Sequence, residues 1–222
     1  MNYQFRFDLV LGSLPELMLG AWLTIQLSVI AMAIGIVFAV LSAIARMSGP
    51  APVKWAIGAY VEVIRNTPFL VQIFIVYFGL PSIGIRFDPN TSALVAMVLN
   101  VAAYVTEILR AGIESVPKGQ TEAGKALGLS QLQVFRHVVL KPAMKSVYPA
   151  LTSQYVLLML QSSVISAISA EELTAIANDV ASRTFASFEV YIIVTGIYFV
   201  MGIAFSAVFS LLFRRIFAYP DK

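Results

Sequence analysis

The spacing of the charged residues constrains this chain more than any other feature. Five long stretches contain no Asp, Glu, Lys or Arg: 17–45, 66–85, 89–106, 146–170 and 190–213. A charged side chain at the centre of a bilayer is costly, and about 20 apolar residues suffice for a helix to cross the hydrocarbon. We therefore predict five membrane-spanning helices, with the third extended past Glu107 to about residue 110.

Composition supports a membrane protein and excludes several other classes. Apolar residues make up 59% of the chain and charged residues 12%, whereas a soluble domain has about 45–50% and about 25%. With no Cys and only His137, the chain cannot form a disulfide framework, a thiolate metal site or a multi-histidine metal site. The predicted fold class is an all-α integral membrane protein, in which residues 1–222 form a single five-helix transmembrane bundle.

The basic residues predict the orientation of the bundle. Of the 15 Lys and Arg residues, only Arg6, Arg86 and Arg183 fall on one predicted side of the membrane. Because cytoplasmic loops are enriched in Lys and Arg, we expect the amino terminus outside and the carboxyl terminus in the cytoplasm. An odd number of spans agrees with that. The basic inner face is ordinary membrane topology, so it does not indicate binding to nucleic acid.

One cytoplasmic loop, about 114–144, is long enough to have structure of its own. Its pattern predicts a short helix over Thr121–Leu127 that Gly128 stops, then a second short helix over Gln131–Val139 that ends at Pro142. Such an element is too small to be a catalytic domain.

Within this loop, Gly119–Ala126 nearly matches the phosphate-binding pattern G-x-x-x-x-G-K-[ST]. That mechanism needs a preceding strand and a hydroxyl group for Mg²⁺. Here Ala126 has no hydroxyl and the end of a membrane helix precedes the motif. We therefore expect no nucleotide, metal or other cofactor in this chain, and no enzymatic site. If ATP drives the protein, another subunit binds the ATP and its Mg²⁺.

The same loop resembles the signature loop of permeases from importers of the ATP-binding-cassette (ABC) class. That signature is Glu-Ala-Ala, three residues, Gly, nine residues, then Ile-x-Leu-Pro. Glu122, Gly128 and Val138 keep its spacing, whereas Gly124 replaces the second Ala and Pro142 comes one residue late.

Other stretches resemble the polar-amino-acid subfamily of these permeases: Arg65–Pro68, Tyr104–Ile113, Ala126–Ser130 and Ser162–Ile168. The resemblance implies a type I importer fold in a bacterial inner membrane. It also implies four partners, namely a cytoplasmic ATP-binding subunit, a second permease that is identical or paralogous, an extracytoplasmic solute-binding protein, and a polar amino acid or related derivative as substrate.

The resemblance further implies that Thr121–Leu127 is a coupling helix that docks on the ATPase. The candidate coupling residues are Glu122, Ala123, Gly124 and Gly128. The alternative is a solvated hairpin that only stabilises the bundle.

Polar side chains within the predicted spans are candidates for a substrate path: Asn100, Tyr104, Gln154, Gln161, Ser162 and Ser163. Polar groups inside a bundle either join helices by hydrogen bonds or line a solvated cavity, and both alternatives stay open. In the subfamily that the chain resembles, importers of cationic amino acids often have a carboxylate at the position of Gln161. The neutral amide therefore favours a substrate without a cationic side chain.

Charged residues at the cytoplasmic ends of the second and third spans suggest a gate built from Arg65, Glu107 and Arg110. The alternative is a simple interfacial ion pair between Glu107 and Arg110, which are three residues apart.

Two other functional classes compete with a permease subunit. A secondary transporter or channel subunit is disfavoured because five spans form no even inverted repeat and no carboxylate lies mid-membrane. A membrane enzyme would need clustered His, Asp or Glu near one interface, and it is disfavoured because the lone His137 lies on the basic loop.

Overall fold

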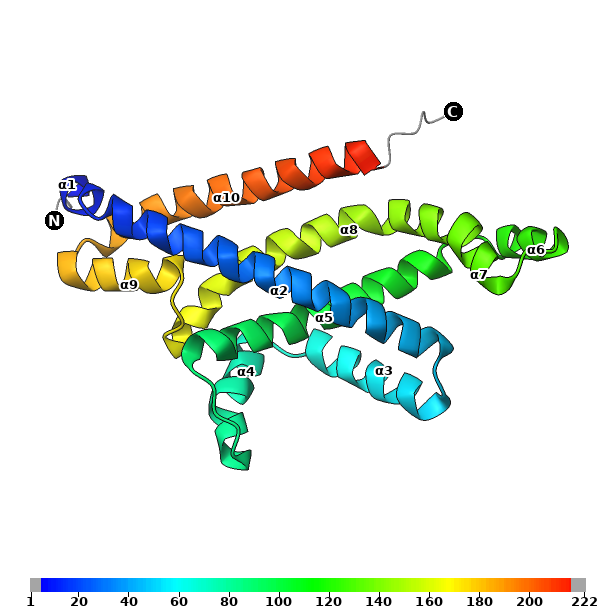
Figure 1. The fold of residues 1–222 in the computed structure, drawn as a ribbon. Helices are drawn as coiled ribbons and strands as arrows, with labels where there is room; N and C mark the ends of the chain where they lie inside the picture. The colour runs from blue at the N-terminus through cyan, green and yellow to red at the C-terminus, as the bar shows by residue number, and fades with distance from the viewer. Residues whose placement is uncertain (1–4, 217–222) are drawn as a thin grey trace.

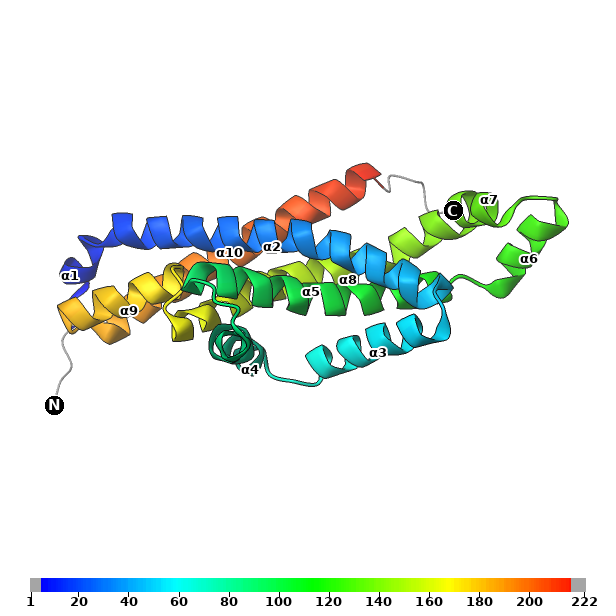
Figure 2. The same cartoon turned by 60° about the horizontal axis from the view of Figure 1, so that its bottom comes forward.

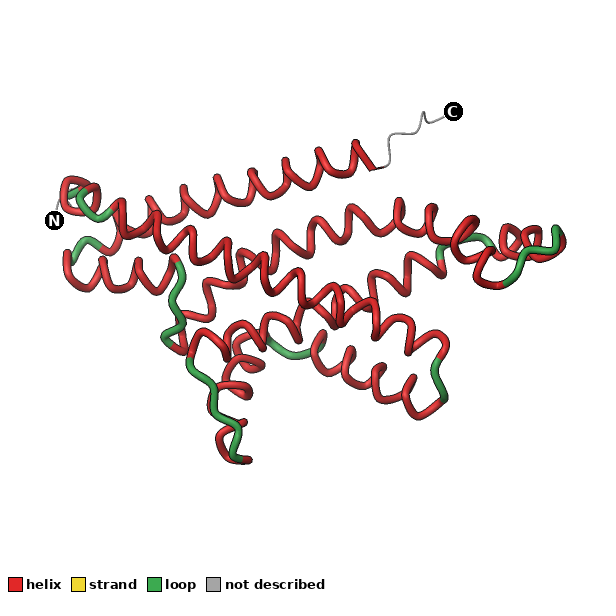
Figure 3. The backbone as a smooth tube through the Cα atoms, viewed as in Figure 1, coloured by secondary structure: helices red, strands yellow, loops and turns green. Residues whose placement is uncertain are grey.

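The computed structural model describes residues 5–216, in which helices and short connections account for all of the backbone and no strand occurs (Figure 3). The first half comprises α1 (Phe7–Leu11), α2 (Leu14–Ser48), α3 (Ala51–Arg65), α4 (Phe69–Phe74), the π turn η1 (Ile75–Gly79), the 3-10 turn η2 (Leu80–Ile83) and α5 (Pro89–Glu114). The second half comprises α6 (Lys118–Ala126), α7 (Gln131–Val134), the π turn η3 (Phe135–Val139), α8 (Leu140–Gln161), the 3-10 segment η4 (Ser162–Ile168), α9 (Leu173–Thr184) and α10 (Ser187–Ile216).

Four helical stretches are long and apolar enough to cross a membrane: Leu14–Ser48, Pro89–Glu114, Gln131–Ile168 and Ser187–Phe213. A fifth span exists if α3 and Phe69–Ile83 count together, but these two segments meet at an angle of 113°. The chain is thus a multi-pass membrane protein, and its predicted orientation stays a prediction.

The second predicted span, 66–85, is the least regular of the five. Its helical part runs from Phe69 to Ile83 and changes from α to π to 3-10 geometry along the way. Two prolines and a glycine explain the irregularity. Pro68 ends the preceding turn, Pro81 lacks a backbone N–H, and Gly84 adopts a φ of +87° that stops the segment.

Two glycines let α5 lie very close to its neighbours in the centre of the molecule (Figures 1 and 2). A Cβ placed on Gly35 of α2 would lie 2.2 Å from Cγ1 of Val101, and one on Gly112 of α5 would lie 1.8 Å from Cγ1 of Val147 on α8. Small residues permit close packing of membrane helices, which dispersion forces then stabilise. The helices α2 and α8 therefore both pack closely on α5.

The helix before α8 does not end at Pro142, so that sequence prediction is wrong. The helix continues from Gln131 through the π turn Phe135–Val139 and α8 to Ile168. Proline at a helix interior leaves the carbonyl four residues earlier without its usual partner. A π turn just before Pro142 changes the hydrogen-bond register, which accommodates the missing N–H without ending the helix.

At the end of the molecule opposite α6, the helix α9 closes the bundle between α2 and α10 (Figure 1). Glu172, at the amino-terminal end of α9, is fully buried. Its carboxylate accepts hydrogen bonds from the backbone N–H of Ala175 and the hydroxyl of Tyr198, both at 2.7 Å. Burial raises the pKa of Glu172 above its ordinary value.

Candidate functional site

The loop between α5 and α8 forms a helical hairpin that protrudes at one end of the molecule (Figure 1). The hairpin turns at Gly128, whose φ of +80° is the left-handed conformation that the sequence predicted there. Ser130 caps α7 with a reciprocal capping box to Gln133. A small core of Val116, Val134, Val139 and Ala143 holds the hairpin to the spans.

The candidate coupling residues divide between the two faces of this hairpin. Glu122, Ala123 and Gly128 are exposed, whereas Gly124 is buried. A Cβ on Gly124 would lie 3.2 Å from Cγ2 of Val134. The missing side chain of Gly124 therefore allows α6 to pack on α7, and the outer face of α6 is open. Next to it, the apolar side chain of Leu127 is 82% exposed.

A charge cluster lies where α2, α3 and α5 meet. Glu107 pairs with Arg46 at 2.7 Å and with Arg110, while a guanidinium nitrogen of Arg65 is 4.0 Å away. Arg110 also pairs with Glu114. The structure thus brings together all three candidate gate residues and adds Arg46. No sequence pattern indicated Arg46, because its pairing with Glu107 depends on how α2 packs beside α5.

Asn100 lies in a polar network that holds the bend between α3 and α4. Its amide donates to Oε1 of Gln72 at 2.9 Å, and the amide of Gln72 donates to the backbone carbonyls of Ile64 at 2.7 Å and Thr67 at 3.0 Å. Both side chains are buried. Within the described chain, Oδ1 of Asn100 is buried without a hydrogen-bond partner. A buried acceptor without a partner is costly, so such an atom points to a ligand or a water molecule.

Gln161 shows the same feature at the end of α8, where its Oε1 is buried without a hydrogen-bond partner among the described residues. The neighbouring hydroxyls are used locally: Ser162 donates to the carbonyl of Met159 and Ser163 to that of Leu160. Ser163 also lines an open hollow of about 840 Å³ between α8 and α10.

The two remaining candidates, Gln154 and Tyr104, lie apart from this hollow. Gln154 is 8% exposed on α8. Tyr104 packs against the charge cluster, with the Arg65 guanidinium 5.7 Å from its ring centroid. Of the six substrate-path candidates, Ser163 is the one that lines the hollow between α8 and α10 among the described residues. Gln72, which joins Asn100 to the bend, was part of the stretch that resembles the subfamily but was not among the substrate-path candidates.

Comparison with known proteins identifies the family. A family model described as "Binding-protein-dependent transport system inner membrane component" matches residues 11–221. The chain belongs to this family. It is a transport permease component of the inner membrane, as predicted, and the alternative of a secondary transporter or channel subunit is not supported.

Individual relatives agree with this assignment over nearly the whole chain. The L-cystine transport system permease protein TcyB of Bacillus subtilis (strain 168) is 37% identical over 97% of this chain and 93% of its own length. The glutamine transport system permease protein GlnP of Escherichia coli (strain K12) is 33% identical over 96% and 98%.

Solved structures show the same fold. A structure described as "Crystal structure of an amino acid ABC transporter with histidines" matches with a TM-score of 0.90 and 36% identity, covering 96% of this chain and 100% of that one. The inward-facing MetNI methionine ABC transporter matches with a TM-score of 0.68 at 20% identity, which indicates a shared fold alone. The prediction of an all-helical permease fold is confirmed.

Proposed function

We propose that this chain is the membrane-spanning subunit of an ATP-driven importer for a polar amino acid or a related derivative. It forms half of the translocation path with a second permease, receives substrate from an extracytoplasmic solute-binding protein, and is driven by a separate cytoplasmic subunit that binds ATP and Mg²⁺. The observation that carries this proposal is the protruding hairpin with an exposed α6. The names of the relatives, which include cystine, glutamine and arginine permeases, support the substrate class.

In this proposal, α6 seats in a groove of the ATPase, with Glu122 and Ala123 on its outer face. Because Gly124 packs against α7, and because the core of the hairpin joins α5 and α8, a displacement of α6 is passed to two spans at once. Closure of the ATPase then moves the spans as rigid bodies between inward-open and outward-open states. Gly128 holds the reversal that aims α6 outward.

The test uses two glycines with nearly the same backbone. Gly128 has a φ of +80° and Gly84 has a φ of +87°, and at neither position does an atom of residues 5–216 lie within 4 Å of an added Cβ. Gly128→Val should lose co-purification of the ATPase subunit, and so should Glu122→Lys, which reverses an exposed charge on α6. Gly84→Val introduces the same backbone strain on another loop and should retain the ATPase. Recovery of the ATPase with Gly128→Val and Glu122→Lys at the wild-type yield would refute the docking role.

The substrate path is proposed to run along Asn100, Tyr104, Gln154, Gln161, Ser162 and Ser163. The buried oxygen atoms of Asn100 and Gln161 have no donors within the described chain, so they suit the ammonium or amide donors of an amino acid. Neither group is charged, and this favours a substrate whose side chain is not cationic.

The charge cluster is proposed to act as a gate at the cytoplasmic end of the path. Glu107 contacts arginines from α2, α3 and α5, so separation of these helices requires at least one of its ion pairs to break. These pairs are partly buried, so salt screens them less than it screens a fully exposed pair.

A further inference from the structure

The side-chain amide of Gln72 is held by three acceptors at the bend between α3 and α4. Its Nε2 donates to the backbone carbonyls of Ile64 at 2.7 Å and Thr67 at 3.0 Å, and it lies 3.0 Å from Oγ1 of Thr67. The Thr67 hydroxyl donates its own proton to the carbonyl of Val63 at 2.8 Å, so towards Gln72 it can only accept. The NH₂ group of Gln72 must therefore face the bend, and its oxygen must face away from it.

This arrangement also determines which way the amide of Asn100 points. Oε1 of Gln72 carries no proton, so only the NH₂ group of Asn100 can pair with it, and the two atoms are 2.9 Å apart. The oxygen of Asn100 is then left facing away from Gln72. The side chains are 7% and 2% exposed, so turning either amide over would leave buried groups without partners, which is costly.

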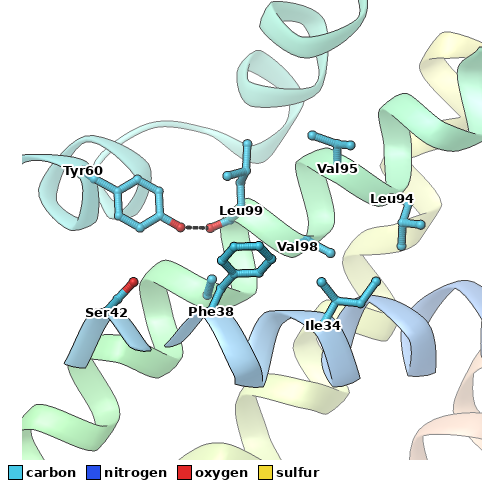
Figure 4. A pocket seen from close by; sticks show the side chains of 9 residues that line it. Ile34, Phe38, Ser42, Tyr60, Leu94, Val95, Val98 and Leu99 are labelled. Carbon is cyan, nitrogen blue, oxygen red and sulfur yellow. Dashed lines mark hydrogen bonds between the residues drawn. The ribbon is translucent and has the colours of Figure 1, made fainter. Parts of the chain in front are cut away.

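The backbone beside Asn100 is anchored from α3 as well. At the edge of an apolar pocket of about 390 Å³, the Tyr60 hydroxyl donates to the backbone carbonyl of Leu99 at 2.6 Å (Figure 4). Asn100 is thus held by α4 through its own side chain and by α3 through its neighbour. A group that is fixed in advance loses little freedom when a ligand binds, so it favours a ligand of matching polarity.

A second amide oxygen without a partner among the described residues is Oε1 of Gln161, the last residue of α8. The segment that follows it, η4, contacts both α4 and α5. The hydroxyls that begin η4 already donate to backbone carbonyls. The amide groups left open in these adjoining segments are therefore both acceptors, which suit N–H donors and repel a carboxylate.

We propose that Gln72 is a positioning residue, which turns the oxygen of Asn100 towards the transported molecule and so selects an amino acid that presents an N–H donor there. The donor is either the α-ammonium group or a side-chain amide, and a carboxylate in the same place is rejected. This inference rests on the proposed transport function. The oxygen is covered in this conformation, so the ligand reaches it when the spans move relative to one another.

Ligand binding to the purified complex of the permease with its ATPase tests the proposal. The solute-binding protein is left out, because its own selectivity would mask that of the permease. Saturation-transfer NMR compares L-glutamine with L-glutamate, which has a carboxylate in place of the side-chain amide, and with glutaramate, which lacks the α-ammonium group. We expect L-glutamine to bind about tenfold more tightly than at least one of them, since a buried polar group without its partner costs about that factor. The analogue that binds weakly identifies the donor.

Three variants separate the orientation of Asn100 from the stability of the bend. Gln72→Met should reduce the tenfold ratio of dissociation constants to less than about twofold, because the amide of Asn100 can then turn over. Thr67→Val loosens the bend but leaves both carbonyls that orient Gln72, so the ratio should persist. Gln26→Met makes the same change at an exposed position of α2 and should also retain it.

Equal binding of all three ligands by the wild type would overturn the proposal, and so would an unchanged ratio in folded Gln72→Met. The wild-type comparison needs no variant, so it decides the matter even where Gln72→Met does not fold. Absence of L-glutamine binding, in a complex that still takes up amino acids once the solute-binding protein is added, would also overturn the proposal and leave the transport function intact. Absence of any ATP-driven uptake by that complete system would instead refute the proposed function.

Discussion

The contact between α5 and α8 gives a quantitative test of the packing. At Gly112 a Cβ would lie 1.8 Å from Cγ1 of Val147 and 3.3 Å from the backbone carbonyl oxygen of Ala143. The first distance is far below van der Waals contact, so Gly112→Ala must displace a helix or a buried valine. Overpacking of this kind costs about 1–3 kcal/mol in the free energy of unfolding.

Gly196 on α10 provides the matched control. It also lies inside a long helix, but no atom of the described part of the chain is within 4 Å of an added Cβ. Gly196→Ala should therefore leave the free energy of unfolding unchanged or raise it by up to about 1 kcal/mol, through helix propensity alone.

Reversible unfolding in mixed micelles, followed by circular dichroism, measures both substitutions. The double variant Gly112→Ala with Val147→Ala removes the clashing methyl groups. Its loss in the free energy of unfolding should be smaller than the sum of the losses from the two single changes by about 0.5–3 kcal/mol, since residues in contact couple by that amount. Equal stability of Gly112→Ala and Gly196→Ala, or strict additivity in the double variant, would show that the helices do not approach as closely as described.

Three further predictions concern the polar groups. Burial raises the pKa of Glu172 above 4.5, so the stability that Glu172 contributes is complete below pH 4.5 and is lost as the pH rises through the higher pKa of the folded state. Glu172→Gln should therefore flatten a plot of the free energy of unfolding against pH over this range, and an unchanged slope would contradict the burial. Gln161→Ala should alter uptake kinetics in reconstituted vesicles for at least one amino acid, whereas Ser153→Ala, on an exposed part of α8, should not; identical kinetics for every amino acid would remove Gln161 from the path. Glu107→Arg should impair uptake, and the double variant Glu107→Arg with Arg46→Glu should recover part of it because the ion pair is restored with its charges reversed. If the double variant takes up no more substrate than Glu107→Arg alone, the pair does not act as a gate.

The candidate site was accessible from the sequence only where a local pattern determines it. The turn at Gly128 is such a case, because a short helix that must reverse within a few residues needs a left-handed backbone. The pairing of Glu107 with Arg110 is another, since residues three apart on a helix are neighbours. The pairing of Glu107 with Arg46 was beyond reach, because 61 residues separate them and only the packing of α2 on α5 brings them together.

Charge-free stretches alone established that this chain is a multi-pass helical membrane protein, because the cost of placing a charge in hydrocarbon applies to each residue without regard to its neighbours. Tertiary structure alone decided which polar groups meet. The amide network of Gln72 and Asn100 that holds the bend after α3 depends on side chains from two different segments. The physical reason is that hydropathy is a local property, whereas a hydrogen bond or an ion pair between helices exists only once packing has brought both partners within reach.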